Sequence, residues 1–204
     1  MTETIDRTRH RVAQRTRAMG FPARHVQAIE YQTLEITAKQ LAAWYEIWPA
    51  VKRGGVVYFF GDRGVGKTAL MSAIGFKWME CLDHGVATYK GQPRYWTARD
   101  LFDSQLMWMS GSKESESPVS IAERAGLLVI DELGEARFTE YQTTELSAIV
   151  DKRYNNALPT ILVSNQDRRG IIERGLSPSV IDRVNDGGVT VDASDWKNMR
   201  KSDT

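Results

Sequence analysis

The sequence predicts an α/β fold in which a parallel sheet carries helices on both faces. Short apolar runs alternate with helical segments from residue 56 to residue 191, which is the order that builds parallel sheets. In addition, the first apolar run, Val56–Phe60, leads through a glycine-rich loop straight into a helix. A strand, a loop of that kind and a helix form the framework of a phosphate-binding site.

The individual elements follow from the same pattern. Runs rich in β-branched and aromatic residues predict strands, and segments with near-helical apolar spacing predict helices. The expected strands are Val56–Phe60, Arg94–Thr97, Leu127–Ile130, Thr160–Val163 and Val189–Val191, and the expected helices are Lys67–His84, Arg99–Met109 and Glu140–Asn155. The polar, serine-rich stretch at 111–118 is expected to be a mobile loop.

Residues 1–50 have a different character from the rest of the chain. Their apolar residues recur at helical spacing, Gly20-Phe21-Pro22 breaks the pattern, and Pro49 with Gly54-Gly55 closes it. We therefore expect a helical N-terminal extension over 1–50 and a nucleotide-binding core over 51–204.

Composition limits the class of protein. The chain has 204 residues, 42% of them apolar, and a net charge of +1, so no strong overall field marks it as a nucleic-acid or membrane binder. The lone Cys81 excludes an internal disulfide and fits core packing in a reducing compartment. No apolar run approaches the roughly 18 residues of a membrane span, and no signal peptide is recognisable, so we expect a soluble cytoplasmic protein without a membrane partner.

One local charge cluster stands out against this balance. Six arginines occur without an intervening acid: Arg7, Arg9, Arg11, Arg15, Arg17 and Arg24. The cluster fits a solvated basic helix and fits equally a contact surface for an acidic partner or nucleic acid.

A phosphate-binding motif follows the first predicted strand. Residues 61–68 match the motif G-x-x-x-x-G-K-[ST] at every fixed position. These residues are Gly61, Asp62, Arg63, Gly64, Val65, Gly66, Lys67 and Thr68, and Ala69 follows in the helix. Glycines let successive N–H groups face the phosphates, and the helix N-terminus adds partial positive charge. Lys67 is expected to reach the β- and γ-phosphates, and the Thr68 hydroxyl to ligate Mg²⁺.

Two further strands end in polar residues. Leu127–Ile130 runs into Asp131-Glu132, where Asp131 is expected to hold Mg²⁺ and Glu132 to deprotonate the attacking water. Taken alone the pair also fits an acidic helix cap; beside a phosphate loop it indicates an ATP hydrolase. Thr160–Ser164 runs into Asn165, which either touches the γ-phosphate or the water, or simply opens a turn.

Together these motifs resemble an AAA+ ATPase core, and within that superfamily the DnaC/DnaI-type helicase loaders and their relative IstB, a transposition helper ATPase. The similarity covers about residues 19–200. Besides the motifs above, it is carried by Met19-Gly20-Phe21-Pro22-Ala23-Arg24, Asp151-Lys152-Arg153-Tyr154, Ile181-Asp182-Arg183-Val184 and Asp195-Trp196-Lys197-Asn198-Met199-Arg200.

The resemblance implies a function and partners. It implies an ATPase with ATP and Mg²⁺ as cofactors, a replicative DNA helicase and single-stranded DNA as partners, and a homo-oligomer with ATP at subunit interfaces. Arg183 is the best match for the arginine that approaches a neighbour's γ-phosphate, with Arg153 as the second candidate. A surface arginine paired with Asp182 or Asp186 is the other interpretation of Arg183.

Departures from the family leave alternatives open. Only about 50 residues precede the core, one cysteine and three scattered histidines give no usual zinc site, and no full lid domain is expected after Val191. The short extension favours a compact loader encoded by a phage or mobile element. The alternatives are an IstB-like helper that binds duplex DNA and a transposase, and a nucleotide-gated adaptor with little turnover. Trp96, Met107 and Trp108 fit either a DNA-facing surface or core packing.

Overall fold

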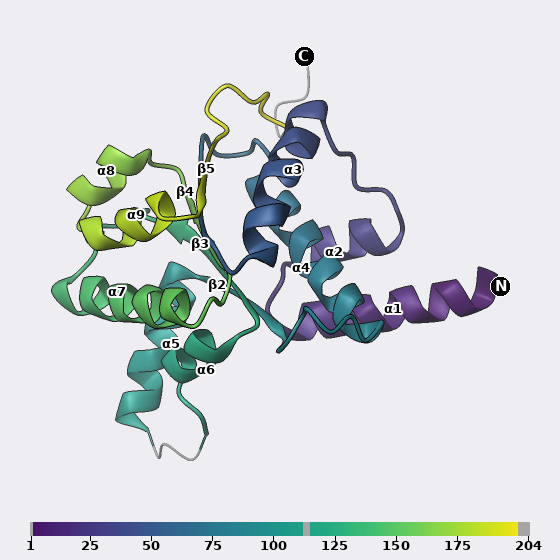
Figure 1. The fold of residues 1–204 in the computed structure, drawn as a ribbon, viewed down its shortest axis with the longest axis horizontal. Coiled ribbons are helices and arrows are strands. Elements are labelled where there is room, and N and C mark those ends of the chain that lie inside the picture. The colour runs from purple at the N-terminus through teal and green to yellow at the C-terminus, as the bar shows by residue number, and fades with distance from the viewer. Residues whose placement is uncertain (1, 112–114, 200–204) are drawn as a thin grey trace.

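A computed structural model describes residues 2–111 and 115–199, and these residues contain a five-stranded sheet, whose place between the helices can be followed in Figure 1. All neighbouring strands are parallel, in the order β2-β3-β4-β1-β5. The strands are β1 (Val56–Phe60), β2 (Pro93–Thr97), β3 (Leu127–Leu133), β4 (Thr160–Ser164) and β5 (Val189–Asp192). The predicted fold class is confirmed.

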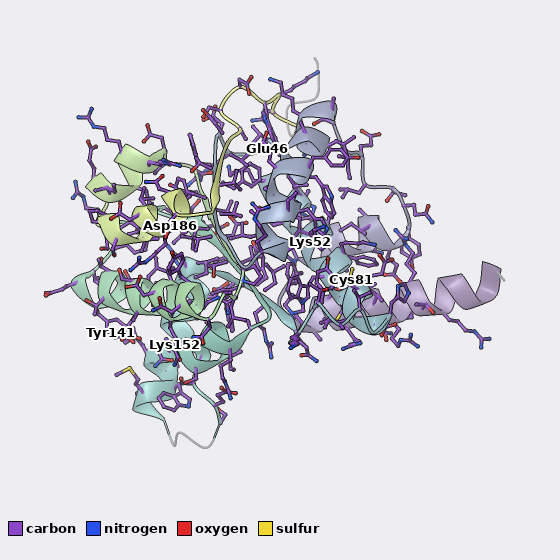
Figure 2. The ribbon with its side chains drawn as sticks, viewed as in Figure 1. Glu46, Lys52, Cys81, Tyr141, Lys152 and Asp186 are labelled. Carbon is purple, nitrogen blue, oxygen red and sulfur yellow. The ribbon has the colours of Figure 1, made fainter. Side chains whose placement is uncertain are left out.

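Helices cover both faces of this sheet. On one face lie α1 (Thr2–Ala18), α2 (Ala23–Glu30), α3 (Ala38–Lys52) and α4 (Lys67–Asp83). On the other lie α5 (Ala98–Ser110), α6 (Pro118–Arg124), α7 (Glu140–Asn155), α8 (Arg168–Glu173) and α9 (Pro178–Asn185). Figure 2 shows the division: Lys52 and Cys81 lie on the α3–α4 side, and Lys152 and Asp186 on the α7–α9 side.

Strand side chains alternate between the two cores. On β1, Val57 and Phe59 join the core under α3 and α4, whereas Val56 and Tyr58 join the core under α7 and α9. This alternation is the period-two geometry of a strand, and both sides are apolar because both faces are covered. The strands are therefore rigid supports for whatever follows their carboxyl ends.

The predicted strands and long helices are present within a few residues of their expected bounds. Three short helices were missed: α6, α8 and α9 have seven, six and eight residues, too few for a periodic signal. The predicted loop at 111–118 falls partly on residues 112–114, outside the described residues; Pro118 already belongs to α6.

Four of the six clustered arginines contact other helices, so this cluster is more than a solvated basic helix. Arg11 and Arg15 pair with Asp83 of α4 at 2.5 and 2.9 Å, and Arg17 pairs with Glu30 of α2 at 2.9 Å. Arg9 donates to the carbonyl oxygens at the end of α2. These contacts dock α1, and they leave fewer cations for an external partner.

The N-terminal helices also share an apolar core with the sheet. Val12 and Ala13 of α1, Phe21, and Ile47 of α3 are buried in the same cluster as Phe59 of β1. The division at residue 50 stays a prediction. In the part of the chain that the structure describes, no helix is long and apolar enough to cross a membrane.

Candidate nucleotide-binding site

The loop Gly61–Gly66 connects β1 to the N-terminus of α4 at the carboxyl edge of the sheet. Gly66 caps α4 in the left-handed conformation, with φ of +93°. A Cβ atom at this position would lie 2.2 Å from the Gln40 amide nitrogen of α3. The backbone conformation therefore favours glycine here, and any side chain would also have to displace the Gln40 amide.

A cavity of about 520 Å³ lies over this loop. Its lining includes Arg24, His25, Leu34 and Met199. It also includes Lys67, Thr68 and Ala69, the carboxylates of Asp131, Glu132 and Glu135, and the strand-end Asn165. The cavity thus combines the phosphate-loop residues with the polar residues that follow β3 and β4.

Lys67 lies buried in the cavity wall with its ammonium group held by three oxygens. It donates to the Gly61 and Asp62 carbonyl oxygens at 2.6 and 2.8 Å and to Asn165 Oδ1 at 2.9 Å. The structure thus brings Lys67 at the start of α4 and Asn165 after β4 together, as the sequence predicts for groups at one sheet edge.

Thr68 and Asp131 also meet. The Thr68 hydroxyl donates to Asp131 Oδ2 at 2.8 Å, and the Tyr95 hydroxyl of β2 donates to the same oxygen at 2.8 Å. Burial and the adjacent Asp131 carboxylate raise the pKa of Tyr95 well above its ordinary value, so the phenol is a permanent donor. A hydroxyl and a carboxylate side by side are the two protein oxygens that Mg²⁺ takes beside phosphate oxygens. The described residues hold no cluster of three or more histidine, cysteine or acidic ligands.

Glu132 lies at an irregularity within β3. Its φ is +60°, and the β3–β4 register shifts between Ile130 and Leu133. A bulge of this kind re-aims a side chain, and a strained backbone at such a place is typical of functional sites. Partial burial and the nearby carboxylates of Glu135, Asp131 and Asp100 raise the pKa of Glu132, which makes it a better proton acceptor.

Glu135 is a pocket residue that the sequence analysis missed. Its carboxylate pairs with Arg63 at 2.9 Å and accepts from Asn165 Nδ2 at 3.4 Å. Both partners are themselves predicted site residues, so Glu135 closes the pocket mouth between the phosphate loop and the end of β4. Tyr95 and Met199 were missed as well, because nothing local in the sequence places them beside the loop.

The two candidate arginines differ completely. Arg153 is fully buried and donates to Thr160 Oγ1 and to the backbone carbonyls of Ala122, Ala125 and Pro159. The suggestion that it faces a neighbour or the nucleotide is therefore wrong: every nitrogen of its guanidinium is engaged inside the domain.

Arg183 lies on α9, outside the lining of its own chain's pocket. It pairs with Asp151 of α7 at 2.8 Å and lies over the Tyr154 ring, with 4.8 Å to the ring centroid. Its hydrogen-bonded partner is thus neither Asp182 nor Asp186. The side chain is about one-third exposed, so a second molecule has access to it.

A sequence model of the IstB-like ATP-binding proteins matches residues 1–170, most of the chain. The chain belongs to the IstB-like ATP-binding family. The prediction of a P-loop ATPase of the AAA+ class is confirmed at the level of family and fold.

Curated relatives of this IstB-like protein carry the name replicative helicase loader DnaC. The protein of Buchnera aphidicola subsp. Schizaphis graminum is 30% identical over 145 residues, 70% of this chain and 55% of the relative. The protein of subsp. Acyrthosiphon pisum is 29% identical over the same shares. The chain therefore spans about half the length of these relatives.

Solved structures share the fold. The DnaC helicase loader superposes with a TM-score of 0.59 at 23% identity, covering 78% of this chain and 92% of that one. DnaI gives 0.61 at 18%, covering 83% and 89%, and AMPPCP-bound DnaA from Aquifex aeolicus gives 0.65 at 19%, covering 83% and 51%.

Proposed function

We propose that this IstB-like protein is a helicase-loading ATPase that binds a replicative DNA helicase and single-stranded DNA under the control of ATP. The observation that carries the proposal is the pocket itself. Lys67 with Asn165, and Thr68 with Asp131, meet at the carboxyl edge of the sheet beside Glu132. The similarity to replicative helicase loaders supports the choice of partner.

ATP is proposed to lie along the cavity with its phosphates over Gly61–Ala69. Lys67 would exchange its carbonyl contacts for phosphate oxygens, and the N–H groups at the start of α4 would face the phosphates. Thr68 and Asp131 fit Mg²⁺, which when bound neutralises charge on the β- and γ-phosphates. Arg24, His25, Leu34 and Met199, which also line the cavity, would surround the base.

The role of general base in hydrolysis is assigned to Glu132, which would accept the proton of the attacking water. Its raised pKa and its position beside Asn165 in the pocket support this role. Asn165, already bonded to Lys67, would orient the water or the γ-phosphate. The carboxylate of Glu135 would hold Arg63 at the pocket mouth.

Arg183 is proposed to act in trans in a homo-oligomer with ATP at subunit interfaces. Its place on α9 outside its own pocket supports this, since it has no ligand to serve there. Its guanidinium would stabilise charge on the γ-phosphoryl group of the neighbouring subunit. The contacts with Asp151 and Tyr154 would hold it ready at the surface.

Arg183→Ala is therefore expected to leave ATP binding by the monomer nearly intact and to lower turnover by the assembly about 10³-fold or more. Mixing Arg183→Ala with Lys67→Ala subunits is expected to restore part of the activity, because some interfaces then combine an intact pocket with an intact arginine. A co-assembled mixture as inactive as its parents would contradict a shared site.

The partner is tested by binding. Fluorescent single- and double-stranded oligonucleotides are titrated with ATP, ADP or no nucleotide, and a replicative helicase is used in a pull-down. A helicase loader retains the helicase and prefers single strands with ATP, with an affinity that falls as salt rises. Duplex preference and no helicase binding would favour the transposition helper, which the family's name supports. Negligible turnover with DNA present would favour a nucleotide-gated adaptor.

A further inference from the structure

Tyr95 is a buried residue of β2 whose hydroxyl reaches the candidate metal site. The residue is 8% exposed, and its hydroxyl donates to Asp131 Oδ2 at 2.8 Å. It comes from a different strand than Asp131 and from outside the phosphate loop. None of the roles assigned above uses it.

The Asp131 carboxylate is fixed by three donors. Oδ2 accepts from the Thr68 and Tyr95 hydroxyls, and Oδ1 accepts from the Glu132 N–H at 2.7 Å. The Thr68 hydroxyl is itself placed to ligate the cation. The Glu132 N–H belongs to the residue on the strained bulge that is assigned to the attacking water. Both donors are therefore part of groups that the ligand engages. Tyr95 is the donor of this set that is anchored away from the ligand.

The backbone of Tyr95 is held from the other side by the turn between α1 and α2. Its N–H donates to the Met19 carbonyl oxygen at 3.0 Å, and its ring packs on Phe21 with centroids 5.5 Å apart. A Cβ atom on Gly20 would lie 2.4 Å from the Tyr95 carbonyl oxygen. The turn therefore covers the edge strand β2 at the residue whose hydroxyl donates to Asp131.

We propose that Tyr95 is a positioning residue that orients Asp131 toward Mg²⁺, and that the Met19–Phe21 turn holds Tyr95 in place for this. The proposal rests on the assignment of the pocket to ATP with Mg²⁺. Hydrogen-bond partners of metal ligands fix ligand orientation, and losing one typically lowers metal affinity by about 10- to 100-fold. Tyr95 thereby links the turn between α1 and α2 to the metal site.

The test is a Mg²⁺ titration of fluorescent ATP binding, which does not depend on turnover. Tyr95→Phe removes only the hydroxyl, and we expect the Mg²⁺ concentration at half-maximal binding to rise about 10-fold. Affinity measured in EDTA should stay at the wild-type value. Tyr58→Phe is the matched control, because Tyr58 is a buried tyrosine of the same sheet whose hydroxyl donates to the Gln166 carbonyl oxygen at 2.7 Å.

The outcomes separate this proposal from the assignment of the pocket. A Tyr95→Phe titration that matches wild type, or a Tyr58→Phe titration shifted equally, overturns the role of Tyr95 alone. Wild-type protein that fails to bind the analogue, or binds it equally with and without Mg²⁺, overturns the pocket assignment and this proposal with it. Thermal unfolding of each variant shows whether the fold is retained.

Gly20→Ala tests the link to the turn without touching the pocket. Its methyl group would displace the Tyr95 carbonyl, so we expect the half-maximal Mg²⁺ concentration to rise in the same direction. In the Gly20→Ala, Tyr95→Phe double variant the two effects should not add, since one hydrogen bond mediates both. Full additivity, or no effect of Gly20→Ala, would contradict the link.

Discussion

The start of α4 and the last turn of α7 each contain a buried cationic side chain, and the two side chains have different surroundings. Lys67 is 7% exposed, is bonded to two carbonyls and Asn165, and lines a cavity of about 520 Å³. Arg153 is 0% exposed, is bonded to backbone carbonyls and Thr160, and does not line that cavity.

The difference separates a ligand-binding cation from a structural one. A buried charge is costly unless it is paired, and both groups satisfy that condition. Lys67 and its partner Asn165 line a cavity, so phosphate oxygens can reach the ammonium group. The partners of Arg153 are carbonyls from α6, the residue after α6 and the start of β4, so the guanidinium ties these segments together. Substitutions in the first region should change function, and those in the second should change stability.

The largest effect is expected from Glu132→Gln in the pocket. An amide cannot accept the proton of water, so turnover should fall by about 10²- to 10⁴-fold while ATP binding persists. Steady-state hydrolysis and a binding titration on the same preparation measure this. Undiminished turnover would show that another group is the general base. A large loss of stability in Glu132→Gln would contradict the claim that substitutions in the pocket region change function and not stability.

Next in size is Arg153→Leu, a structural change. Its loss leaves several buried carbonyl oxygens without donors, so the free energy of unfolding should fall by about 2–4 kcal/mol. Denaturant unfolding measures it, with Arg183→Leu as the control, because Arg183 is a partly exposed arginine of the same face. Equal effects of the two substitutions would refute a special structural role for Arg153.

The smallest effect is expected at the docking of α1, where arginines again serve structure. The side chains of Asp83 and Glu30 are 7% and 6% exposed. The hydrogen bond from Arg11 is the largest effect that lowers the pKa of Asp83, and those from His10 and Arg17 lower the pKa of Glu30 despite its burial. Their stabilisation is therefore complete above their ordinary pKa values of 3.8 and 4.5 and is lost as pH falls through the lower folded values.

Asp83→Asn should accordingly lower the free energy of unfolding at neutral pH by about 0.5–1 kcal/mol. The difference from wild type should vanish in acid, below the folded pKa of Asp83. Denaturant unfolding of both proteins across the acidic range measures this convergence. A difference that persists or grows at the lowest pH would show that packing, and not the carboxylate, is responsible.

Local patterns predicted the centre of the site. Gly61–Thr68 and Asp131-Glu132 are contiguous motifs, and each directly follows or ends a predicted strand. The strand alone fixes where these residues lie, so no distant contact had to be known. Asn165 was predicted to lie near because parallel strands end at a common edge, and it bonds Lys67.

Long-range neighbours set the limit of that prediction. Tyr95 touches Asp131 only because β2 lies beside β3, and Met199 reaches the loop only because the chain returns there after β5. The sequence offers both Arg153 and Arg183 as candidates for the arginine that approaches a neighbouring subunit. Only the packing of α7 and α9 shows that Arg153 is buried and Arg183 is accessible. Strand order and burial are tertiary properties, so no motif contains them.

The central claim is that the cavity over Gly61–Ala69 binds ATP through Lys67, and a titration of Lys67→Ala with a fluorescent ATP analogue tests it most directly. A charge-assisted hydrogen bond contributes about 1.5–3 kcal/mol, so the affinity should fall by about 10- to 100-fold or more. The denaturant midpoint should stay near that of wild type. A variant that binds the analogue as tightly as wild type would contradict the assignment of this pocket.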